Sequence, residues 1–424
     1  MKKTLLLGAG FSSDFGMPLA KELSQVFFGI FNKTNVKTFA VVLSRNKPYT
    51  EDRPINKEAI VEGLNLLLKY KDNSGSDYEE FLSDLQSLED LPNKTQSDKD
   101  SYHYLFGIFY ELIHSILSIY QLESYTVLYA KNRQWFSAFS NFFSEEETWI
   151  FTLNHDLYIE CLALDLKIPI TYGDGKKISF PLSNLEMDKK IHFTYSERNS
   201  LDKDSLGFFK KERGLNLVKL HGGLSELEYK DRVLICNQTL NKENSLELIQ
   251  DFKNVEDLAY FHQGKKIPSG KDRVITNSDG ELDIISKSML TGGNKYSKTT
   301  NVKEGEEKLK ILDDVLRQLD ELTILGYGFG DPHINYRISN AMVLNSNLKV
   351  RIVDPTSNTK PDFLEQFDYG LRVSGAFCRA AEWMEYSGSE KWNLEQSNAL
   401  KENERYRLQI QKQVEAVLRS NLKG

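Results

Sequence analysis

The opening of the sequence constrains the fold more than any other stretch. An apolar run at residues 5–7 leads into a turn with glycines at positions 8 and 10, and helical spacing follows over residues 19–23. This order predicts a strand, a glycine-rich turn and a helix at the start of a domain. Glycines allow a backbone to approach a pyrophosphate closely, and a helix N-terminus offers N–H groups to it. The stretch is therefore a candidate nucleotide-binding unit.

A steric explanation of this turn also stands at this point. The usual G-x-G-x-x-G pattern has a glycine where this chain has Ser13, and the next glycine is Gly16. Many turns between a strand and a helix carry two glycines only because the backbone bends tightly there. The motifs at the other strand ends are needed to distinguish a nucleotide-binding turn from a turn that has glycines only for steric reasons.

Composition restricts the class of protein. The chain has 424 residues, enough for two or three sub-domains. Lys and Arg number 54 and Asp and Glu 61, and a net charge of −7 is not typical of a general nucleic-acid binder. The three cysteines, Cys161, Cys236 and Cys378, are too few and too widely spaced for a disulfide framework or a four-cysteine zinc site. We expect no metal.

The hydrophobic pattern favours a cytoplasmic protein. We expect no transmembrane helix, because no run approaches 18 uninterrupted apolar residues. The leucine run at residues 5–7 is too short for a signal-peptide core and is needed as a strand.

The middle of the chain is predicted to be mainly helical. Residues 32–58 are polar and are interpreted as a connection, and residues 59–145 show helical spacing almost throughout. Residues 102–121 are apolar on more than one face, which predicts a well-buried helix. We interpret its two histidines, His103 and His114, as half-buried helix residues rather than catalytic groups.

Strand signals return in the second half of the chain. Strands are predicted at 148–153 and 215–220, and residues 269–283 are predicted to be an exposed loop within a polar insertion at 226–306. A helix at 307–319, a strand with a second glycine-rich turn, a helix at 332–343 and a strand ending at Asp354 follow. The charged helix pattern at 389–424 either packs against another subunit or is a solvated tail.

Four strand ends carry polar or glycine motifs. These are GAGFSS at 8–13, TLNHD at 152–156, KLHGG at 219–223 and GYGFGD at 326–331. Alternating strands and helices indicate an α/β fold with a parallel sheet, in which ligands bind at the carboxyl ends of the strands. The four motifs therefore converge on one crevice in the predicted fold.

In their order and strand context these motifs resemble sirtuin-like proteins of the bacterial branch related to the sirtuin deacylases. GAGFSSDFGMPLAKEL, the L-H-G element and GYGFGDPHIN are similar in particular to the sirtuin-like domains of phage-defence proteins. The resemblance implies a Rossmann-like parallel sheet with a helical insertion and a C-terminal helix. It places the core domain at 1–31, 146–225 and 307–380, the helical insertion at 32–145, the polar insertion at 226–306, and a segment suited to oligomerisation at 381–424.

The resemblance also implies roles for individual residues, with NAD+ as the substrate. Asn154 holds the nicotinamide ribose and an attacking water, His221 is the general base, and Asp156 lies near the nicotinamide pocket. The residues placed against NAD+ are Gly8, Ala9, Gly10, Phe11, Ser12, Pro18, Thr152, Gly222, Gly326, Tyr327, Gly328 and Asp354. Cleaving the N-glycosidic bond needs orientation, a neutral polar group near the positive carbon and a base with a pKa near neutrality, which Asn and His supply.

Two departures from the deacylating sirtuins favour water as the acceptor. The four-cysteine zinc module is absent, and Leu19-Ala20-Lys21 follows Pro18 where those sirtuins have Phe-Arg. Both departures oppose binding of an acyl-lysine peptide. We interpret His155 as structural or pocket-lining, and His333 and Asn335 as bracing the second turn or touching ligand.

The resulting expectation is an NAD+ glycohydrolase that produces ADP-ribose and nicotinamide and depletes NAD+ during phage infection. The resemblance implies a homo-oligomer, with a HerA-like ATPase as a possible second subunit and a phage-derived trigger. Two alternatives remain open, an NAD-dependent protein deacylase or ADP-ribosyltransferase, and a non-catalytic scaffold that senses NAD or ADP-ribose. The preference between NAD and NADP is also open.

Overall fold

A parallel sheet of seven strands forms the centre of the molecule. The computed structural model describes residues 3–45, 55–73, 75–143, 146–204, 207–267, 269–290, 306–356, 360–368 and 371–421. The strand order is β15-β14-β13-β1-β2-β6-β3, and every neighbouring pair is parallel. The strands are β1 (Lys3–Leu7), β2 (Glu147–Thr152), β3 (Ile170–Thr171), β6 (Gly214–Lys219), β13 (Glu321–Leu325), β14 (Lys349–Val353) and β15 (Val373–Ala376). This confirms the predicted α/β, Rossmann-like parallel sheet.

The central strand β1 is apolar on both faces because helices cover both sides of the sheet. Leu5 and Leu7 belong to one core and Leu6 to another, as the two-residue period of a strand requires. Helices α10 (Glu306–Leu316) and α11 (Pro332–Leu344) line the Leu6 side.

The region predicted to be mainly helical is helical, and it lies on the other side of the sheet. Its helices are α2 (Ala20–Gly29), α3 (Lys33–Arg45), α4 (Lys57–Asp72), α5 (Tyr78–Ser87) and α6 (Gln96–Ser124), and the helical path continues as a π-helix (Tyr125–Tyr129), α7 (Ala130–Asn132) and a 3₁₀ helix (Arg133–Phe142). The prediction of a connection at 32–58 is wrong where α3 lies, since Val36 and Leu43 are buried on one helix face. Residues 46–54 of that segment lie outside the described residues.

The long helix α6 is a core helix of this structure. By length and hydropathy the stretch Gln96–Phe142 qualifies as a candidate membrane span, and 61% of the window that qualifies is buried inside the protein. His103 is exposed and His114 is fully buried, so the prediction of half-burial is wrong for both. Burial lowers the pKa of His114 well below its usual value.

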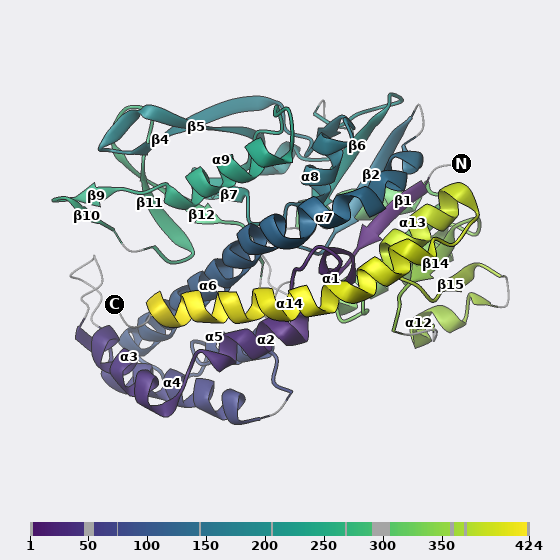
Figure 1. Cartoon of the computed structure of the whole chain (residues 1–424). Helices are drawn as coiled ribbons and strands as arrows, with labels where there is room; N and C mark the ends of the chain where they lie inside the picture. The colour runs from purple at the N-terminus through teal and green to yellow at the C-terminus, as the bar shows by residue number, and fades with distance from the viewer. Residues whose placement is uncertain are drawn as a thin grey trace.

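A six-stranded antiparallel sheet lies beside the parallel sheet (Figure 1). It consists of β4 (Lys176–Ser183), β5 (Glu186–Glu197), β7 (Glu226–Tyr229), β8 (Leu234–Gln238), β11 (Asp272–Thr276) and β12 (Leu282–Lys287), with α9 (Ser245–Asp257) packed on it. The prediction of an exposed loop at 269–283 is wrong, because β11 pairs with β12 and buries Ile275. Strands β4 and β5 come from the segment 146–225 that the expected division assigns to the core domain.

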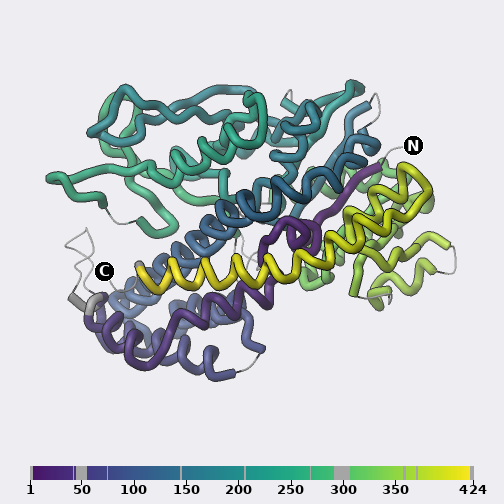
Figure 2. The backbone as a smooth tube through the Cα atoms, in the orientation of Figure 1, coloured from purple at the N-terminus to yellow at the C-terminus, as the bar shows by residue number. Residues whose placement is uncertain are grey.

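The C-terminal helix α14 (Leu394–Asn421) packs within its own chain. It follows α13 (Ala380–Ser389) and runs beside α6 and α2 (Figures 1 and 2). Ile410 and Val414 are buried, and Arg407 forms an ion pair of 2.5 Å with Glu22 of α2. The described part of this segment therefore has an apolar face that its own chain covers.

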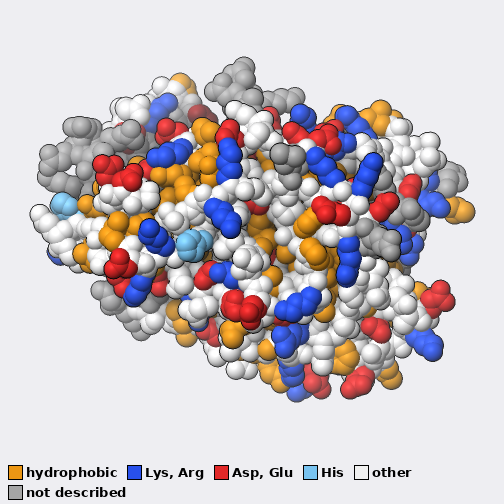
Figure 3. Space-filling model, turned by 90° about the horizontal axis from the view of Figure 1, so that it is seen from above, with side chains coloured by type: hydrophobic (Ala, Val, Ile, Leu, Met, Phe, Trp, Pro, Cys, Tyr) orange, Lys and Arg blue, Asp and Glu red, His pale blue; other side chains and the backbone are white. Residues whose placement is uncertain are grey.

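Positive and negative side chains are mixed on the surface. The face in Figure 3 intersperses Lys and Arg with Asp and Glu, and small apolar areas lie between them. This distribution agrees with the small net charge of −7 and differs from the single-sign stripe that nucleic-acid binders present.

Candidate functional site

The candidate site lies at the carboxyl edge of the parallel sheet, beside β1. The chain proceeds from β1 to β2 and β6 on one side, and it adds β13, β14 and β15 on the other. The strand order therefore reverses at β1, and ligands in open α/β sheets bind at such a switch point. The turns after β1, β2, β6 and β13 carry the four motifs found in the sequence.

The two glycine turns are in direct contact. The amide N–H of Gly8 donates to Leu325 O (3.0 Å), and that of Gly10 donates to Gly326 O (2.9 Å). A Cβ at Gly10 would lie 2.7 Å from Gly326 Cα, and one at Gly8 would lie 2.6 Å from Gly326 O. Gly326 also has φ +63°, which favours glycine. Turn-to-turn packing thus explains these three glycines, and all three of their amides are engaged within the protein, since the Gly326 N–H donates to Val353 O (3.0 Å).

The predicted glycine-rich turn contains a short helix of its own. Helix α1 (Ala9–Ser13) spans one turn and α2 is a separate helix, because Gly16 has φ +104° and Pro18 follows. A one-turn helix does not supply the aligned dipole on which the sequence argument relied. The helix predicted from the spacing over residues 19–23 is α2, whereas the one-turn helix α1 within the predicted turn was not expected.

Asn154 connects the end of β2 to the first glycine turn. Its Nδ2 donates to Gly8 O (2.9 Å) and to Ser12 Oγ (2.8 Å), and its backbone N–H donates to Thr152 Oγ1 (3.0 Å). Ser12 and Thr152 are buried. The amide is consequently fixed in position by two neighbouring strand ends.

Asp156 is buried under this network. Burial raises the pKa of its carboxyl, which Lys219 and a hydrogen bond from Ser12 lower to a smaller extent. Lys219 donates to the Asp156 carbonyl and forms an ion pair of 2.6 Å with Glu160. Asp156 is therefore a buried group between the ends of β2 and β6, and it supports the turn that follows β2.

His221 follows β6 and meets a carboxylate from the β13 turn. Its Nε2 lies 2.9 Å from Asp331 Oδ2, and the two side chains are 6% and 14% exposed. The ring of His155 is 6.5 Å away between centroids, and His155 Nδ1 lies 3.2 Å from Gly222 O. The predicted base thus has an acidic partner, which sequence reasoning had missed.

The second glycine turn is ordered by its own polar side chains. The Tyr327 hydroxyl accepts from the Asp331 N–H (3.1 Å) and lies 3.0 Å from Asn335 Oδ1. Asn335 Nδ2 donates to Phe329 O (2.8 Å), which supports the positive φ of Phe329. Asn335 thus braces the turn, one of the two roles considered for it. By contrast, a Cβ at Gly328 would meet nothing within 4 Å.

The other predicted site residues lie at different depths. The Phe11 ring is fully buried against Phe136, so we expect only its backbone to face a ligand. Pro18 is buried beyond α1. Asp354 ends β14, and its Oδ1 accepts from both the N–H and the hydroxyl of Thr356 (2.7 Å each).

The antiparallel sheet also reaches this site. The segment after β12 passes His221, where the Leu290 N–H donates to His221 O (2.8 Å). Gly222 has φ +69°, and a Cβ there would lie 2.4 Å from Ser288 O. No periodicity signal links residues 288–290 to KLHGG. Asp331 was detectable as the last residue of the GYGFGD motif, followed by a proline typical of a helix start.

Two sizeable cavities lie away from this edge. One of about 690 Å³ lies at the amino ends of β1 and β2 and includes Thr4 and Trp149 in its lining. Another of about 580 Å³ is lined in part by residues 167–172. We place the site by strand direction, since volume alone does not indicate chemistry. Within the described residues, no group of three or more His, Cys, Asp or Glu side chains is arranged to hold a metal ion.

Comparison with known proteins adds a likeness to sirtuin structures. No protein-family model and no curated protein matches the chain. Similar solved structures include Sir2Tm bound to a propionylated peptide, with 10% identity, a TM-score of 0.32 and coverage of 92% of each chain. A Sir2 histidine-to-alanine variant with a deacetylated p53 peptide and 3′-O-acetyl ADP-ribose has 10% identity, a TM-score of 0.32, and coverage of 92% of this chain and 93% of that one. At these identities and TM-scores the likeness does not strengthen the placement of the site, which rests on the strand topology.

Proposed function

We propose that the protein is an NAD+ glycohydrolase that releases nicotinamide and transfers ADP-ribose to water. The observation that carries the proposal is the meeting of a fixed Asn154 amide and the His221–Asp331 pair at the switch point of the sheet. The motif order of the sequence supports NAD+ as the substrate.

Each residue then has a defined task. Loss of nicotinamide leaves a positively charged ribose carbon, which a neutral amide such as that of Asn154 tolerates without being attacked. Hydrogen bonds to Gly8 and Ser12 hold the amide in place, so its orientation costs little at the moment of reaction. His221 accepts a proton from a ribose hydroxyl or from the attacking water.

The acceptor is proposed to be water rather than a protein. Cys161, Cys236 and Cys378 are each buried and free, which supports the view that the zinc module of the deacylating sirtuins has no counterpart here. A deacylase or an ADP-ribosyltransferase would cleave the same bond and differ only in the acceptor. A sensing scaffold would bind NAD+ without cleaving it.

The biological role we propose is NAD+ depletion in the cytoplasm during phage infection. Support comes from the similarity of GAGFSS, L-H-G and GYGFGDPHIN to sirtuin-like domains of phage-defence proteins. Such an activity has to be silent in healthy cells, so assembly into a homo-oligomer, a HerA-like ATPase subunit or a phage-derived trigger would control it.

The first prediction concerns turnover. We expect purified wild-type protein to convert NAD+ to nicotinamide and ADP-ribose, and Asn154→Ala and His221→Ala each to abolish the reaction. Chromatography of the products measures this, with the native mass of each sample recorded and with phage lysate added in a parallel series. Asn345→Ala is the structural control, because it removes an asparagine amide that donates to Leu319 O (2.7 Å) away from the carboxyl edge of the sheet.

Four results would contradict the proposal or one of its residue roles. Loss of an acetyl group from a peptide in step with NAD+ use would identify a deacylase, and label transfer from NAD+ to protein would identify an ADP-ribosyltransferase. Tight NAD+ binding without turnover in every assembled state would identify a scaffold. Near-normal turnover by His221→Ala would remove His221 as the base.

A further inference from the structure

The pair formed by His221 and Asp331 joins two separate strand ends. His221 follows β6, whereas Asp331 lies after β13 and is the N-cap residue of α11. The Nε2–Oδ2 distance is 2.9 Å and both side chains are largely shielded from water. A hydrogen bond to an ionised carboxylate in such surroundings is stronger than one at the surface.

Asp331 is itself held from several directions. Its Oδ1 accepts from the backbone N–H of His333 (2.9 Å) and of Ile334 (3.4 Å), the first turn of α11. Its own N–H donates to the Tyr327 hydroxyl (3.1 Å). One carboxylate oxygen therefore caps the helix and the other faces His221, so the pair has little freedom to rotate.

We propose that Asp331 is a positioning residue that fixes the tautomer and orientation of His221 for the reaction, an inference that rests on the proposed function. An ionised carboxylate only accepts hydrogen bonds, so Nε2 carries the hydrogen and the basic lone pair is on Nδ1. When a hydroxyl or water loses its proton, the O–H bond breaks and an Nδ1–H bond forms. Asp331 stays ionised and stabilises the resulting imidazolium.

Other titratable groups near His221 have partners of their own among the described residues. His155 of the β2–α8 turn, where α8 is Tyr158–Asp165, lies 6.5 Å away between ring centroids. Lys219, two residues earlier on β6, forms an ion pair with Glu160. Asp331 is therefore an acidic group in hydrogen-bond contact with His221.

Asp331→Asn tests the inference without removing the cap, because asparagine is also a preferred N-cap residue. When its carbonyl oxygen caps α11, its NH₂ faces Nε2 and imposes the opposite tautomer. We expect kcat for NAD+ cleavage to fall at least ~100-fold, with KM within about threefold of the wild-type value. Asp77→Asn is the matched control, since Asp77 caps α5 by accepting from the Glu79 N–H (2.6 Å) and should leave kcat unchanged.

The second readout needs no activity. Hydrogen–deuterium exchange at the ring C2–H, read by mass spectrometry across a pH series, gives the pKa of each of the seven histidines. We expect the His221 pKa to fall by about one unit or more in Asp331→Asn, because an adjacent carboxylate raises it, and to stay unchanged in Asp77→Asn.

An unchanged His221 pKa, or a kcat loss that Asp77→Asn reproduces, would overturn the role of Asp331. Absence of turnover in wild-type protein under every condition would instead overturn the proposed function, and the exchange measurement would still decide whether Asp331 controls His221.

Discussion

Glycines in the two turns have different physical roles although the sequence presents them alike. Gly8, Gly10 and Gly326 lack side chains because the turns touch at backbone distance. Gly328 and Gly330 have open space where a Cβ would be, and neither has a positive φ. The sequence reasoning assigned Gly8, Gly10, Gly326 and Gly328 to NAD+ approach, and the geometry leaves Gly328 as the one that packing does not explain.

This contrast yields a prediction at single residues. Gly10→Ala should lower the free energy of unfolding by roughly 1–3 kcal/mol, the usual cost of overpacking, because the new methyl group meets the backbone of Gly326. Gly328→Ala should leave the melting temperature near the wild-type value and weaken NAD+ binding by taking space at the site. Thermal unfolding and calorimetric titration measure the two effects.

Gly330→Ala is the matched control for Gly328→Ala, since its Cβ is equally unobstructed. Equal NAD+ affinity of these two variants would show that the ligand does not approach Gly328.

At the scale of elements, the hydrophobic periodicity of the sequence predicted which helices and strands exist better than it predicted how the strands pair. The strand predicted at 148–153 is β2 (Glu147–Thr152), and the helix at 332–343 is α11 (Pro332–Leu344). Such elements bury one face or lie wholly inside, so their local pattern reflects their environment. The one-turn helix α1 was missed because its five residues are too few to show a helical period.

The antiparallel sheet was missed for a different reason. Its strands alternate buried and exposed residues, as with Ile191 and Phe193 on β5, but the hairpins that they form come from separate parts of the chain and are joined by the pairings β5–β8 and β7–β12. The sequence of residues 269–283 is polar because one face of the β11–β12 hairpin is exposed to solvent. At the site, the strand-end motifs were predictable from sequence, whereas the contacts of Asp331 and Leu290 with His221 depend on tertiary structure.

A pH prediction concerns the contact between α1 and the C-terminal segment. Asp14 is buried at the end of α1 and lies 3.0 Å from Arg379, yet burial dominates and raises its carboxyl pKa to about 6. Unfolded, the same group ionises near its ordinary pKa of about 3.9. Between these values the folded protein binds more protons, so the free energy of unfolding falls as pH rises and levels off above pH ~6.

Asp14→Asn should lack this contribution. Relative to the variant, wild-type protein should lose about 3 kcal/mol of unfolding free energy between pH 4 and pH 7, two pKa units at about 1.4 kcal/mol each. Urea unfolding at a series of pH values measures the difference. Parallel curves for the two proteins would show that the Arg379 ion pair offsets the burial of Asp14 completely.

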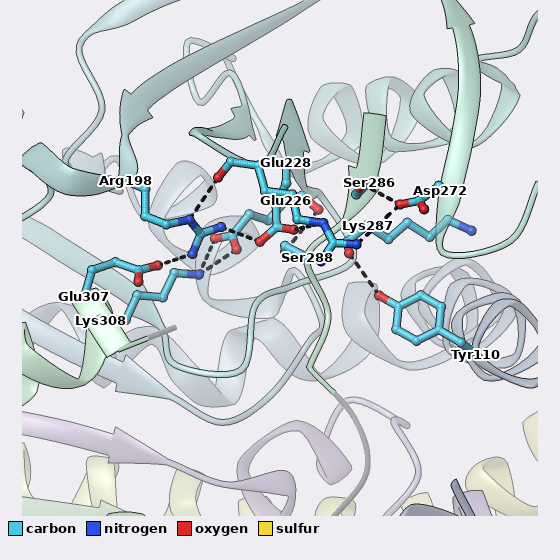
Figure 4. A network of polar contacts seen from close by, with 11 residues as sticks. Tyr110, Arg198, Glu226, Glu228, Asp272, Ser286, Lys287, Ser288, Glu307 and Lys308 are labelled. Carbon is cyan, nitrogen blue, oxygen red and sulfur yellow. Dashed lines mark hydrogen bonds and ion pairs between the residues drawn. The ribbon is translucent and has the colours of Figure 1, made fainter. Parts of the chain in front are cut away.

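At the scale of the whole molecule, buried ion pairs join the antiparallel sheet to the rest (Figure 4). Lys308 of α10 contacts both carboxylate oxygens of Glu226 on β7, at 2.6 and 2.8 Å. Arg198 bridges Glu228 of β7 (2.5 Å) and Glu307 of α10 (2.6 Å). On the other side of the sheet, Lys287 of β12 pairs with a glutamate of α6, and Tyr110 of α6 donates to the Lys287 carbonyl (3.3 Å).

A double-mutant cycle tests whether this attachment is specific. Lys308→Met should destabilise the protein by about 3–5 kcal/mol, because it leaves the Glu226 carboxylate buried without its cation. Adding Glu226→Gln should recover much of that loss, since no buried charge then remains at the pair. Thermal unfolding of the two single variants and the double variant measures the coupling, and additive effects would mean that the two groups do not interact.

The position of β1 has a consequence for how the protein is made. The strand at Lys3–Leu7 leaves the ribosome well before its neighbours in the finished sheet, which begin at Glu147 and Glu321. One edge of this strand, which carries three consecutive leucines, therefore lacks its partner until residue 325 has been synthesised, and contacts so distant in sequence form slowly. Throughout that interval the growing chain carries an unpaired strand of the kind that aggregates. The yield of soluble protein thus depends on what shields the first strand while translation is still under way.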